Sequence, residues 1–370
     1  MVQMKSSIVV CLIAIGALSM TQVPSIQAED DGGAVFVMTN SASGNQIQVF
    51  TRSEGGTLQG AGSFSTGGNG SGGSIDPLHS QGSLLLSADH RLLFAVNAGS
   101  GTVTSFGVQG SHLALLDTEP SGGSSPTALA QIGDLLYVLN SGGSGNVTGF
   151  HVSRGGDLSQ IKNSTRNLSG AATAPTSLAF SPNGLFLVVT ETATSDIDVF
   201  RVFGNGELSG ITINPSSGGV PFAAVFASNG ALIVGNASNN ISSYELQWNG
   251  SLKAISSQIP TLGIATCWDV IASGGRYVYT SNAGSSTVSG FSIGRTGTLT
   301  AVDQTVVGTN PTGSANLDIA ASADGRFLYT LNSGAGAIGI FSVDRDGSLK
   351  VVTQVGGLPA AAGLNGIAAY

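Results

Sequence analysis

Charged residues are scarce in this sequence and make up 9% of its 370 positions. Lys and Arg number 13 and Asp and Glu number 21, which gives a net charge of -8 at pH 7. A chain with so few basic residues lacks the positive stripe that a phosphate backbone requires, which argues against nucleic acid as a partner. Binding to an anionic lipid surface is disfavoured for the same reason.

Cysteine and long hydrophobic runs are also nearly absent. Of the two cysteines, Cys11 lies close to the N-terminus and Cys267 is alone in the rest of the chain, so the mature protein is expected to form no internal disulfide. The apolar run at residues 8–18 is too short for a membrane span, which needs about 20 residues. We therefore expect no membrane span, and a stability that comes from a large core.

The same apolar run has the features of a secretory signal peptide. Lys5 precedes it, and Ala28 offers a small residue for cleavage before Glu29. The sequence thus predicts a signal peptide over residues 1–28 and a single domain over residues 29–370. The mature protein is expected to be secreted, periplasmic or at the cell surface.

Glycine and apolar residues are abundant by contrast. Glycine occurs 55 times, hydrophobic residues reach 41%, and the mean hydropathy is +0.27. This hydrophobicity excludes disorder for most of the length, and 11 prolines are too few for a collagen-like chain. Long helices are disfavoured because glycine and serine dominate where alanine, leucine and glutamate would be expected. The composition therefore predicts an all-β fold.

Two markers recur along the chain roughly every 48 residues. The first is an aromatic residue at the end of a short apolar stretch, found as Phe50, Phe106, Phe150, Phe200, Tyr244, Phe291 and Phe341. The second is the leucine of a Gly-x-Leu or closely related motif, found as Leu58, Leu113, Leu158, Leu208, Leu252, Leu299 and Leu349. Both markers give the same period and seven copies.

Each copy contains four short stretches of β-forming residues separated by turns. The fourth copy is the clearest, with expected strands at 177–180, 185–190 and 198–202 and a last strand that starts near Gly206. Four strands in a period of 40–50 residues are typical of a β-propeller blade. The chain starts on a second strand at 35–38, and its missing first strand reappears at 366–370. We therefore predict a seven-bladed β-propeller of four-stranded blades, closed by the C-terminal strand in the first blade.

The turns between the first two strands carry a recognisable pattern, which reads SADHRLLF from Ser87, SPNGLFL from Ser181 and SADGRFLY from Ser322. This pattern, together with Gly-x-Leu, resembles the lactonase-type seven-bladed propellers, which include 6-phosphogluconolactonase and the carboxy-muconate cyclases. The resemblance implies an exported enzyme that hydrolyses or cyclises a sugar or muconate lactone at the central channel. The alternative is a non-catalytic propeller that binds a glycan, a cell-wall component or a protein.

Candidate site residues are sought in the loops before first strands and between second and third strands, which share one face of a propeller. Glu191 breaks the repeat, because the other copies have Asn, Ser or Ala near that place, and the family commonly has an Asn-Glu pair where this chain has Thr190-Glu191. Under the enzyme hypothesis Glu191 or Asp318 is the general base, and His79, which precedes a first strand, is its acid–base partner. The expected ligand-binding residues are Asp76, Asn97, Asn140, Asn236, Asp269, Asn282 and Asn332.

The chain also departs from the family pattern. Where that pattern typically has Pro-Arg-His or Pro-His at the start of a first strand, this sequence has Pro-Thr, at Pro126, Pro175 and Pro311. Among the arginines, Arg166 alone is expected near the channel face. A phosphorylated lactone is therefore expected to be a poor substrate, and the sequence leaves the choice between enzyme and binding protein open.

Cofactors and partners are expected to be few. Cysteine and histidine are too rare for a zinc site of the usual spacing, and no cofactor or metal is predicted. The expected partner is a small lactone or a glycan at the mouth of the channel, and the expected state is a monomer.

Overall fold

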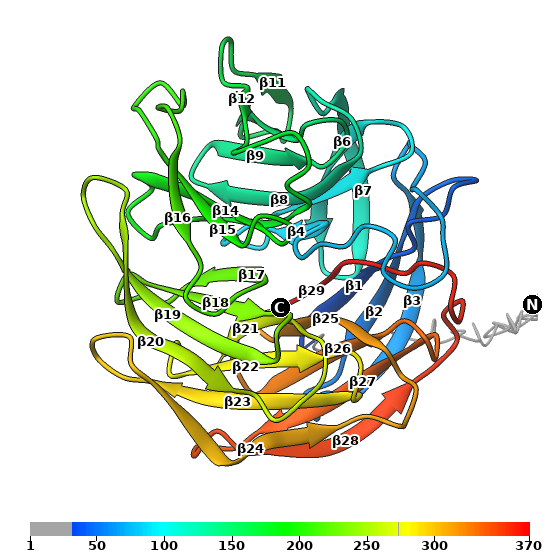
Figure 1. Ribbon diagram of the computed structural model, residues 1–370. Helices are drawn as coiled ribbons and strands as arrows, with labels where there is room; N and C mark the ends of the chain where they lie inside the picture. Colours follow the sequence, from blue (N-terminus) through cyan, green and yellow to red (C-terminus); the bar gives the residue numbers. More distant parts are fainter. Residues whose placement is uncertain (1–31, 273) are drawn as a thin grey trace, which may run out of the picture. The chain divides into compact units, whose positions relative to one another are not determined.

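The computed structural model describes residues 32–272 and 274–370, and these contain strands but no α-helix. The predicted signal peptide at 1–28 lies outside the described residues. No helix of the described part is long and apolar enough to cross a membrane. The strands form seven antiparallel sheets, arranged as blades around one centre (Figure 1). The prediction of a seven-bladed propeller is confirmed.

The first blades follow one another along the chain, each with its strands in order from the centre outwards. Blade 1 contains β1 (Ala34–Met38), β2 (Gln46–Arg52) and β3 (Leu58–Ser65); blade 2 contains β4 (Leu84–Leu86), β5 (Leu92–Asn97), β6 (Thr102–Gln109) and β7 (His112–Pro120). Blade 3 contains β8 (Pro126–Ile132), β9 (Leu135–Asn140), β10 (Asn146–Val152) and β11 (Leu158–Gln160), with the short β12 (Arg166–Asn167) also paired to β10.

The remaining blades repeat the same order. Blade 4 contains β13 (Pro175–Phe180), β14 (Phe186–Glu191), β15 (Asp196–Arg201) and β16 (Thr212–Pro215); blade 5 contains β17 (Pro221–Phe226), β18 (Ala231–Asn236), β19 (Asn240–Leu246) and β20 (Leu252–Pro260). Blade 6 contains β21 (Thr266–Ala272), β22 (Tyr277–Asn282), β23 (Thr287–Ile293) and β24 (Leu299–Thr309); blade 7 contains β25 (Asn316–Ala321), β26 (Phe327–Asn332), β27 (Ala337–Val343) and β28 (Leu349–Val355).

The ring is closed by the last strand, β29 (Ile367–Ala369), which pairs with β1 as the innermost strand of blade 1. Its register places Ile367 opposite Val37 and Ala369 opposite Val35. Gly33 has to be glycine here, because its φ is +133° and a Cβ would lie 2.0 Å from the carbonyl oxygen of Tyr370. The predicted closure by residues 366–370 is confirmed.

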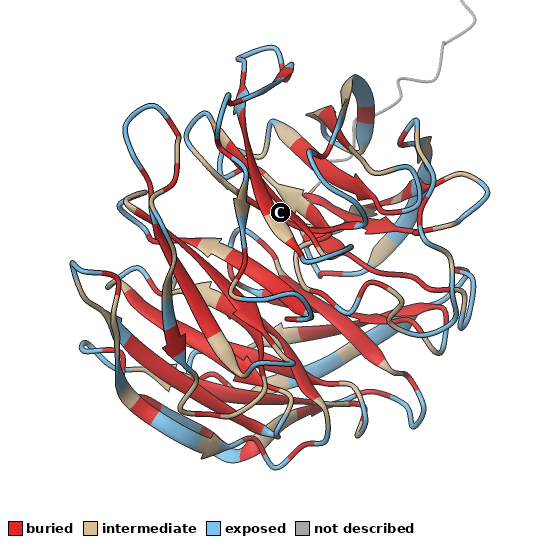
Figure 2. Ribbon diagram, turned by 45° about the horizontal axis from the view of Figure 1, so that its top comes forward, coloured by how far each residue is buried: buried red, intermediate tan, exposed pale blue. Residues whose placement is uncertain are grey.

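The core lies between the blades. The second strands are buried along their whole length, as in β14 and β18, because each blade is covered by a neighbour on both sides (Figure 2). The outer strands, such as β20, consist mainly of exposed and partly buried residues. The repeated aromatic residues are all buried, which explains why they keep their place in every copy. Cys267 is free and buried.

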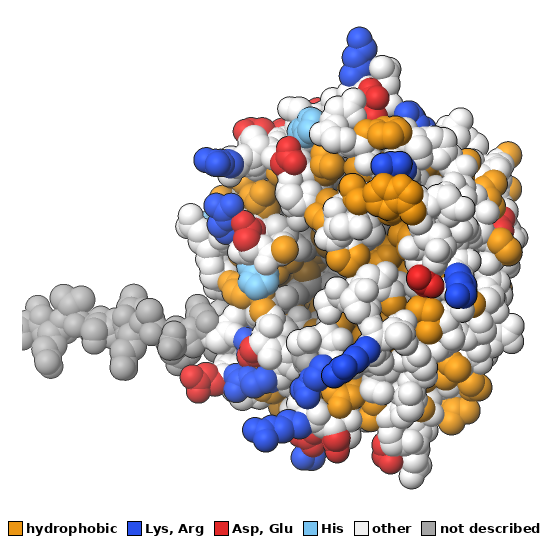
Figure 3. Space-filling model, turned by 90° about the vertical axis from the view of Figure 1, so that its left-hand side faces the viewer, with side chains coloured by type: hydrophobic (Ala, Val, Ile, Leu, Met, Phe, Trp, Pro, Cys, Tyr) orange, Lys and Arg blue, Asp and Glu red, His pale blue; other side chains and the backbone are white. Residues whose placement is uncertain are grey.

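Each blade has two ends, and these define two faces of the ring. We call the end with the loops between second and third strands and the links between blades the loop face. The other end, with the tight turns such as 181–184 and 247–250, is the turn face. The side of the molecule drawn in Figure 3 carries charged side chains of both signs among hydrophobic and uncharged polar ones.

Candidate functional site

The link between β3 and β4 crosses the centre of the ring on its way from blade 1 to blade 2. We call its residues 76–82 the plug. On one side of the centre, the Gln81 amide donates to the carbonyl of Thr176 at 2.9 Å, and the Ser80 hydroxyl donates to the carbonyl of Thr127 at 2.8 Å. These partners lie near the start of the innermost strands of blades 3 and 4, so the plug sits at the loop-face end of the centre.

On the other side, the plug is bound to β21 of blade 6. The Gln81 side chain forms a pair of hydrogen bonds with the backbone of Asp269, donating to its carbonyl at 2.6 Å and accepting from its amide at 3.1 Å. The indole of Trp268 donates to the carbonyl of Ser80 at 2.9 Å. Because these bonds come from several blades, the plug holds a fixed position across the ring.

His79 lies on the plug and is exposed. Its ring stacks on Phe222 of blade 5 with the ring centres 5.0 Å apart, and Phe222 in turn meets Trp268 edge-on at 5.1 Å. Desolvation against this aromatic surface lowers the pKa of the imidazole below its ordinary value. His79 is therefore a neutral imidazole at pH 7 that is within reach of solvent.

Asp76 begins the plug, and the structure brings it together with Asp318. Asn365, just before β29, donates to the Asp76 carboxylate at 3.2 Å. The Asp318 carboxylate accepts from the amides of Ile319 at 2.9 Å and Ile367 at 3.1 Å. Burial raises the pKa of Asp76 and of Asp318 to about 7 each, and the neighbouring Asp76 charge adds to the shift of Asp318. Both acids therefore titrate near neutral pH.

The backbone of the plug is under local strain. Asp76 has a φ of 45° and His79 a φ of 48°, both in the left-handed region that non-glycine residues seldom adopt. The His79 amide donates to the Asp76 carbonyl at 3.3 Å, so the two residues are the ends of one tight turn. Such strain persists only where surrounding contacts enforce it, and it is often found at functional sites.

The Asp269 side chain lies apart from the Asp76–Asp318 pair. Its carboxylate packs on Gly235 of β18, where a Cβ would come within 2.6 Å of a carboxylate oxygen, and it is almost completely buried. Burial raises the pKa of Asp269 to about 7. The side chain thus lies between blades 5 and 6, and its predicted role in ligand binding stays a prediction.

The five predicted ligand-binding asparagines end the second strands of their blades and are fully buried. Asn97 shows their common arrangement: its amide nitrogen donates to Thr102 and Thr104, and its carbonyl oxygen accepts from Thr66 at 2.6 Å. A glycine of the preceding link covers the side chain so closely that a Cβ would lie 2.6 Å or less away. These glycines, Gly68, Gly123, Gly218 and Gly263, cover Asn97, Asn140, Asn236 and Asn282 respectively.

Asn332 of blade 7 has no such glycine above it and instead donates to the Asn310 side chain at 3.0 Å. In each of these blades the asparagine fastens the end of the second strand to a loop or a neighbouring strand. Ligand binding by the asparagines stays a prediction.

Glu191 occupies the asparagine position of blade 4. The sequence suggests a loop, but the residue is the last of β14 and is fully buried. Its carboxylate accepts from the Ser169 amide at 3.1 Å, from the Ser169 hydroxyl and from the Thr194 hydroxyl at 2.7 Å. Ser169 lies where other blades have the covering glycine. The described contacts of Glu191 thus lie within blade 4 and the link before it, and none of them is with His79 or Asp318.

Asp198 stands beside Glu191, at the place taken by Thr104 in blade 2. Desolvation, followed by the neighbouring Glu191 carboxylate, raises the pKa of Asp198 to about 9. Asp198 therefore keeps its proton at pH 7.

The family of the protein can now be given. Residues 22–270 and 270–357 match the family described as Lactonase, 7-bladed beta-propeller. The chain belongs to this lactonase family. Comparison with curated protein sequences found no significant match.

Solved structures share the fold at low sequence identity. A candidate 6-phosphogluconolactonase from Bacteroides fragilis is 19% identical, with a TM-score of 0.68 over 92% of this chain and 98% of that one. The periplasmic gluconolactonase PpgL of Pseudomonas aeruginosa is 20% identical, with a TM-score of 0.67 over 90% and 98%. A candidate 6-phosphogluconolactonase from Bacteroides uniformis is 18% identical, with a TM-score of 0.70 over 91% and 99%.

No ion pair of Asp76, Asp269 or Asp318 is found within the described ranges. The expectation that Arg166 approaches the channel face is wrong, because its guanidinium donates to the backbone carbonyls of Asn163, Thr165, Leu208 and Ser209, in outer parts of blades 3 and 4. Among the described residues, no group of three or more His, Cys, Asp or Glu side chains could hold a metal ion.

The buried carboxylates make the lactonase propeller less stable at high pH. The pKa of Asp198 is higher in the folded state than its unfolded value near 3.8. The contribution of this residue to the free energy of unfolding is therefore complete below pH 4 and is lost as the pH rises towards 9. The stabilising contributions of Asp76, Asp269 and Asp318 are lost between pH 4 and 7. Asp198→Asn should therefore raise the free energy of unfolding at pH 9 by about 1–3 kcal/mol and change it less at pH 6.

Thermal unfolding at pH 6 and pH 9 measures this effect. Asp324→Asn is the matched control, because hydrogen bonds from Ser322 and Arg326 and the Arg52 charge outweigh desolvation and lower the pKa of Asp324 to about 2. That substitution should destabilise the protein equally at both pH values. A melting temperature of Asp198→Asn that falls at pH 9 would contradict the raised pKa of Asp198.

Sequence reasoning missed several residues that build this region. Ser80, Gln81 and Trp268 position the plug, and Asp198 pairs with Glu191. The sequence did contain a signal for Asp198. This acid takes the place that Thr104 has in blade 2 and Ser289 has in blade 6, so it breaks the repeat as Glu191 does. The plug had no comparable signal, because its glycine-rich link follows no repeat.

Proposed function

We propose that this lactonase-family propeller hydrolyses or cyclises a neutral sugar or muconate lactone at the loop-face end of its centre. The observation that carries the proposal is the pair of Asp76 and Asp318, two carboxyl groups that titrate near pH 7, with the neutral imidazole of His79 three residues after Asp76 on the plug. Groups with pKa values close to the working pH are the most effective general acids and bases. Strain at Asp76 and His79 supports the same location.

The proposed reaction uses the groups that reach solvent. His79 takes a proton from water as the water oxygen bonds to the lactone carbonyl carbon. The protonated form of Asp76 donates a hydrogen bond to the carbonyl oxygen as negative charge develops there. The ring C–O bond then breaks, and the leaving alkoxide receives the proton held by His79, which gives the open hydroxy acid. Asp318 favours the protonated form of Asp76, because two neighbouring carboxylates resist ionising together.

Glu191 remains an alternative as the base, as the sequence suggests. Its complete burial and its bonds to Ser169 and Thr194 favour a structural role instead. The proposal therefore rests on Asp76 and His79, and comparison of variants at Asp76 and Glu191 distinguishes the two.

Neutral lactones should be better substrates than phosphorylated ones. The acids at the plug repel a phosphate dianion, and in the described part of the chain no arginine or lysine forms an ion pair with them. Hydrolysis of glucono-δ-lactone, galactono-γ-lactone, a muconolactone and 6-phosphogluconolactone should be followed beside enzyme-free blanks, because lactones open spontaneously. We expect kcat/KM for a neutral lactone to exceed that for the phosphorylated one by at least about tenfold. Faster turnover of 6-phosphogluconolactone would contradict the charge argument.

The alternative function is a non-catalytic propeller that binds a glycan or a protein. The filled centre favours it, because the plug occupies the position of an open channel. Absence of turnover above the blank for every lactone would support this alternative.

Export is part of the proposal and rests on the predicted signal peptide. N-terminal sequencing of the mature protein should find Glu29 as the first residue, and an intact Met1 would argue against export.

A further inference from the structure

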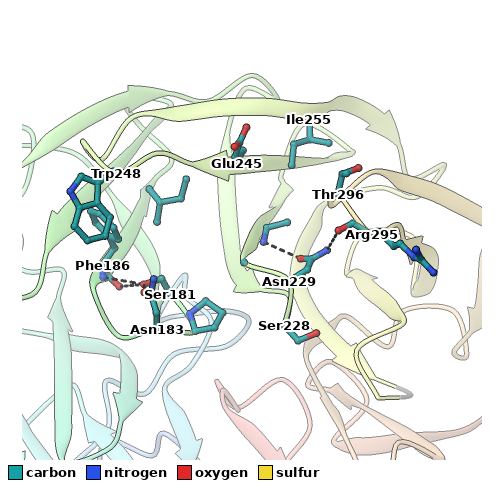
Figure 4. A pocket seen from close by; sticks show the side chains of 14 residues that line it. Ser181, Asn183, Phe186, Ser228, Asn229, Glu245, Trp248, Ile255, Arg295 and Thr296 are labelled. Atoms are coloured by element: carbon teal, nitrogen blue, oxygen red, sulfur yellow. Dashed lines mark hydrogen bonds between the residues drawn. The ribbon is translucent and has the colours of Figure 1, made fainter.

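A pocket of about 620 Å³ opens on the turn face, at the end of the blades opposite to the plug. Its walls come from the turns at 181–186 of blade 4 and 228–231 of blade 5, from 245–248 and Ile255 of blade 5, and from 295–296 of blade 6 (Figure 4). The volume falls within the range of about 300–1,000 Å³ that is typical of small-molecule sites. None of the plug residues lines it.

Trp248 forms one side of this pocket and is 64% exposed. Its ring is held in place: the Arg201 guanidinium lies 4.8 Å from the ring centre, and Phe186 meets the ring edge-on at 6.2 Å. Arg201 does not line the pocket, so it covers the part of the ring that is turned away from it. Trp248 therefore presents an aromatic surface whose orientation is set before any ligand arrives, which reduces the entropy lost on binding.

Polar groups line the pocket together with the indole, with Asn183 on the side of Trp248 and with Glu245 and Arg295 farther from it (Figure 4). Asn229 is used in holding the turn of blade 6, because its amide donates to the carbonyls of Gly294 and Arg295 at 3.1 and 3.2 Å. The Asn183 amide nitrogen, the Glu245 carboxylate and the Arg295 guanidinium have no hydrogen-bond partner within residues 32–272 and 274–370. The pocket thus offers two kinds of donor and one strong acceptor to a ligand.

The charges in the pocket select against several ligand classes. Glu245 and Arg295 carry opposite charges, so the site has no excess of basic groups for a phosphate or another anion. A purely apolar ligand would cover these polar groups without pairing them, which costs free energy. A ligand with one apolar face and several hydroxyl groups can cover the indole with that face and form hydrogen bonds with the polar groups. β-1,4-linked hexoses have this form, because their equatorial hydroxyls leave an axial C–H face that lies flat on an aromatic ring.

We propose that this pocket binds a neutral β-1,4-linked oligosaccharide. One hexose ring stacks on Trp248, and its hydroxyls bind Asn183, Glu245 and Arg295. The site is separate from the plug and does not depend on lactone chemistry. An exported protein with such a site could be held on a polysaccharide while its loop face stays free.

The two tryptophans allow a direct test, because only Trp248 is exposed and Trp268 is buried beside the plug. The full chain, labelled with ¹⁵N, should show two indole resonances, which single substitutions assign. Titration with cellotetraose or tetra-N-acetylchitotetraose should shift the Trp248 resonance and leave Trp268 in place. Tetragalacturonate, which is acidic, should bind at least tenfold more weakly.

Calorimetric titration of variants with the same sugars completes the test. Trp248→Ala should weaken binding by at least tenfold, and Trp248→Phe should restore part of it, whereas Leu262→Ala, an exposed apolar control on the loop face, should bind as the wild type does. All three variants should hydrolyse lactones like the wild type. Failure of both neutral sugars to bind, a stronger response to tetragalacturonate, or unchanged binding by Trp248→Ala would overturn the proposal without affecting the lactone proposal.

Discussion

Removal of residues 366–370 should lower the melting temperature by roughly 10 °C or more, or cause aggregation. The deletion takes away β29, exposes the edge of the fully buried β1 and removes the buried side chain of Ile367 from the core. Burial of one isoleucine side chain stabilises by about 1.5–3 kcal/mol, and the lost strand pairing adds to it. Differential scanning calorimetry and size-exclusion chromatography measure both outcomes.

Tyr370→Ala is the matched control for this deletion. Its ring stacks on His90 at 5.2 Å and on Phe36 at 6.2 Å, but β29 ends at Ala369, so the substitution keeps the closing strand. A drop of only a few degrees is expected. If the five-residue deletion melts no lower than Tyr370→Ala, strand pairing does not hold the ring closed.

The second large effect is expected at the plug. Asp76→Asn should reduce kcat for the best neutral lactone by roughly 10²–10⁴-fold, the usual contribution of a positioned acid or base. The fold should survive, because the amide is isosteric and removes a carboxyl whose pKa burial has raised to about 7. Steady-state kinetics with a melting curve for each variant tests this.

Two further variants make the result specific. Asp134→Asn changes an exposed acid that pairs with His151 on the turn face, and it should leave kcat unchanged. Glu191→Gln should also retain most activity if Glu191 holds the fold of blade 4. A loss of 10²-fold or more in Glu191→Gln, with Asp76→Asn active, would instead favour the base that the sequence suggests.

The blade architecture was readable from the sequence because the same packing recurs in every copy. Phe106, Phe150 and Phe200 take equivalent buried positions between neighbouring blades, so their spacing reports the blade period directly. The closing strand was readable as well, since the first copy lacks a first strand and the chain ends in one. Both inferences need only local pattern and repetition.

The site was harder to predict, because it depends on contacts between segments far apart in the chain. Asp76 and His79 were found as candidates, but nothing local indicates that residues 76–82 cross the ring to reach Thr176 and Asp269. The asparagines were interpreted as ligand-binding because they recur. Recurrence in nearly every blade is also expected of a structural role, and the covering glycines are a signal in the sequence for such a role.

The most direct test of the proposed catalytic site follows the indole of Trp268, which donates to Ser80 of the plug at 2.9 Å. Gluconolactam, a lactam analogue of a neutral lactone that resists hydrolysis, should be titrated into ¹⁵N-labelled protein at concentrations that inhibit lactone turnover. Binding at the loop-face end of the centre predicts a shift of the Trp268 resonance with Trp248 unchanged. A shift of Trp248 alone, or inhibition with neither resonance moving, would contradict a catalytic site at the plug.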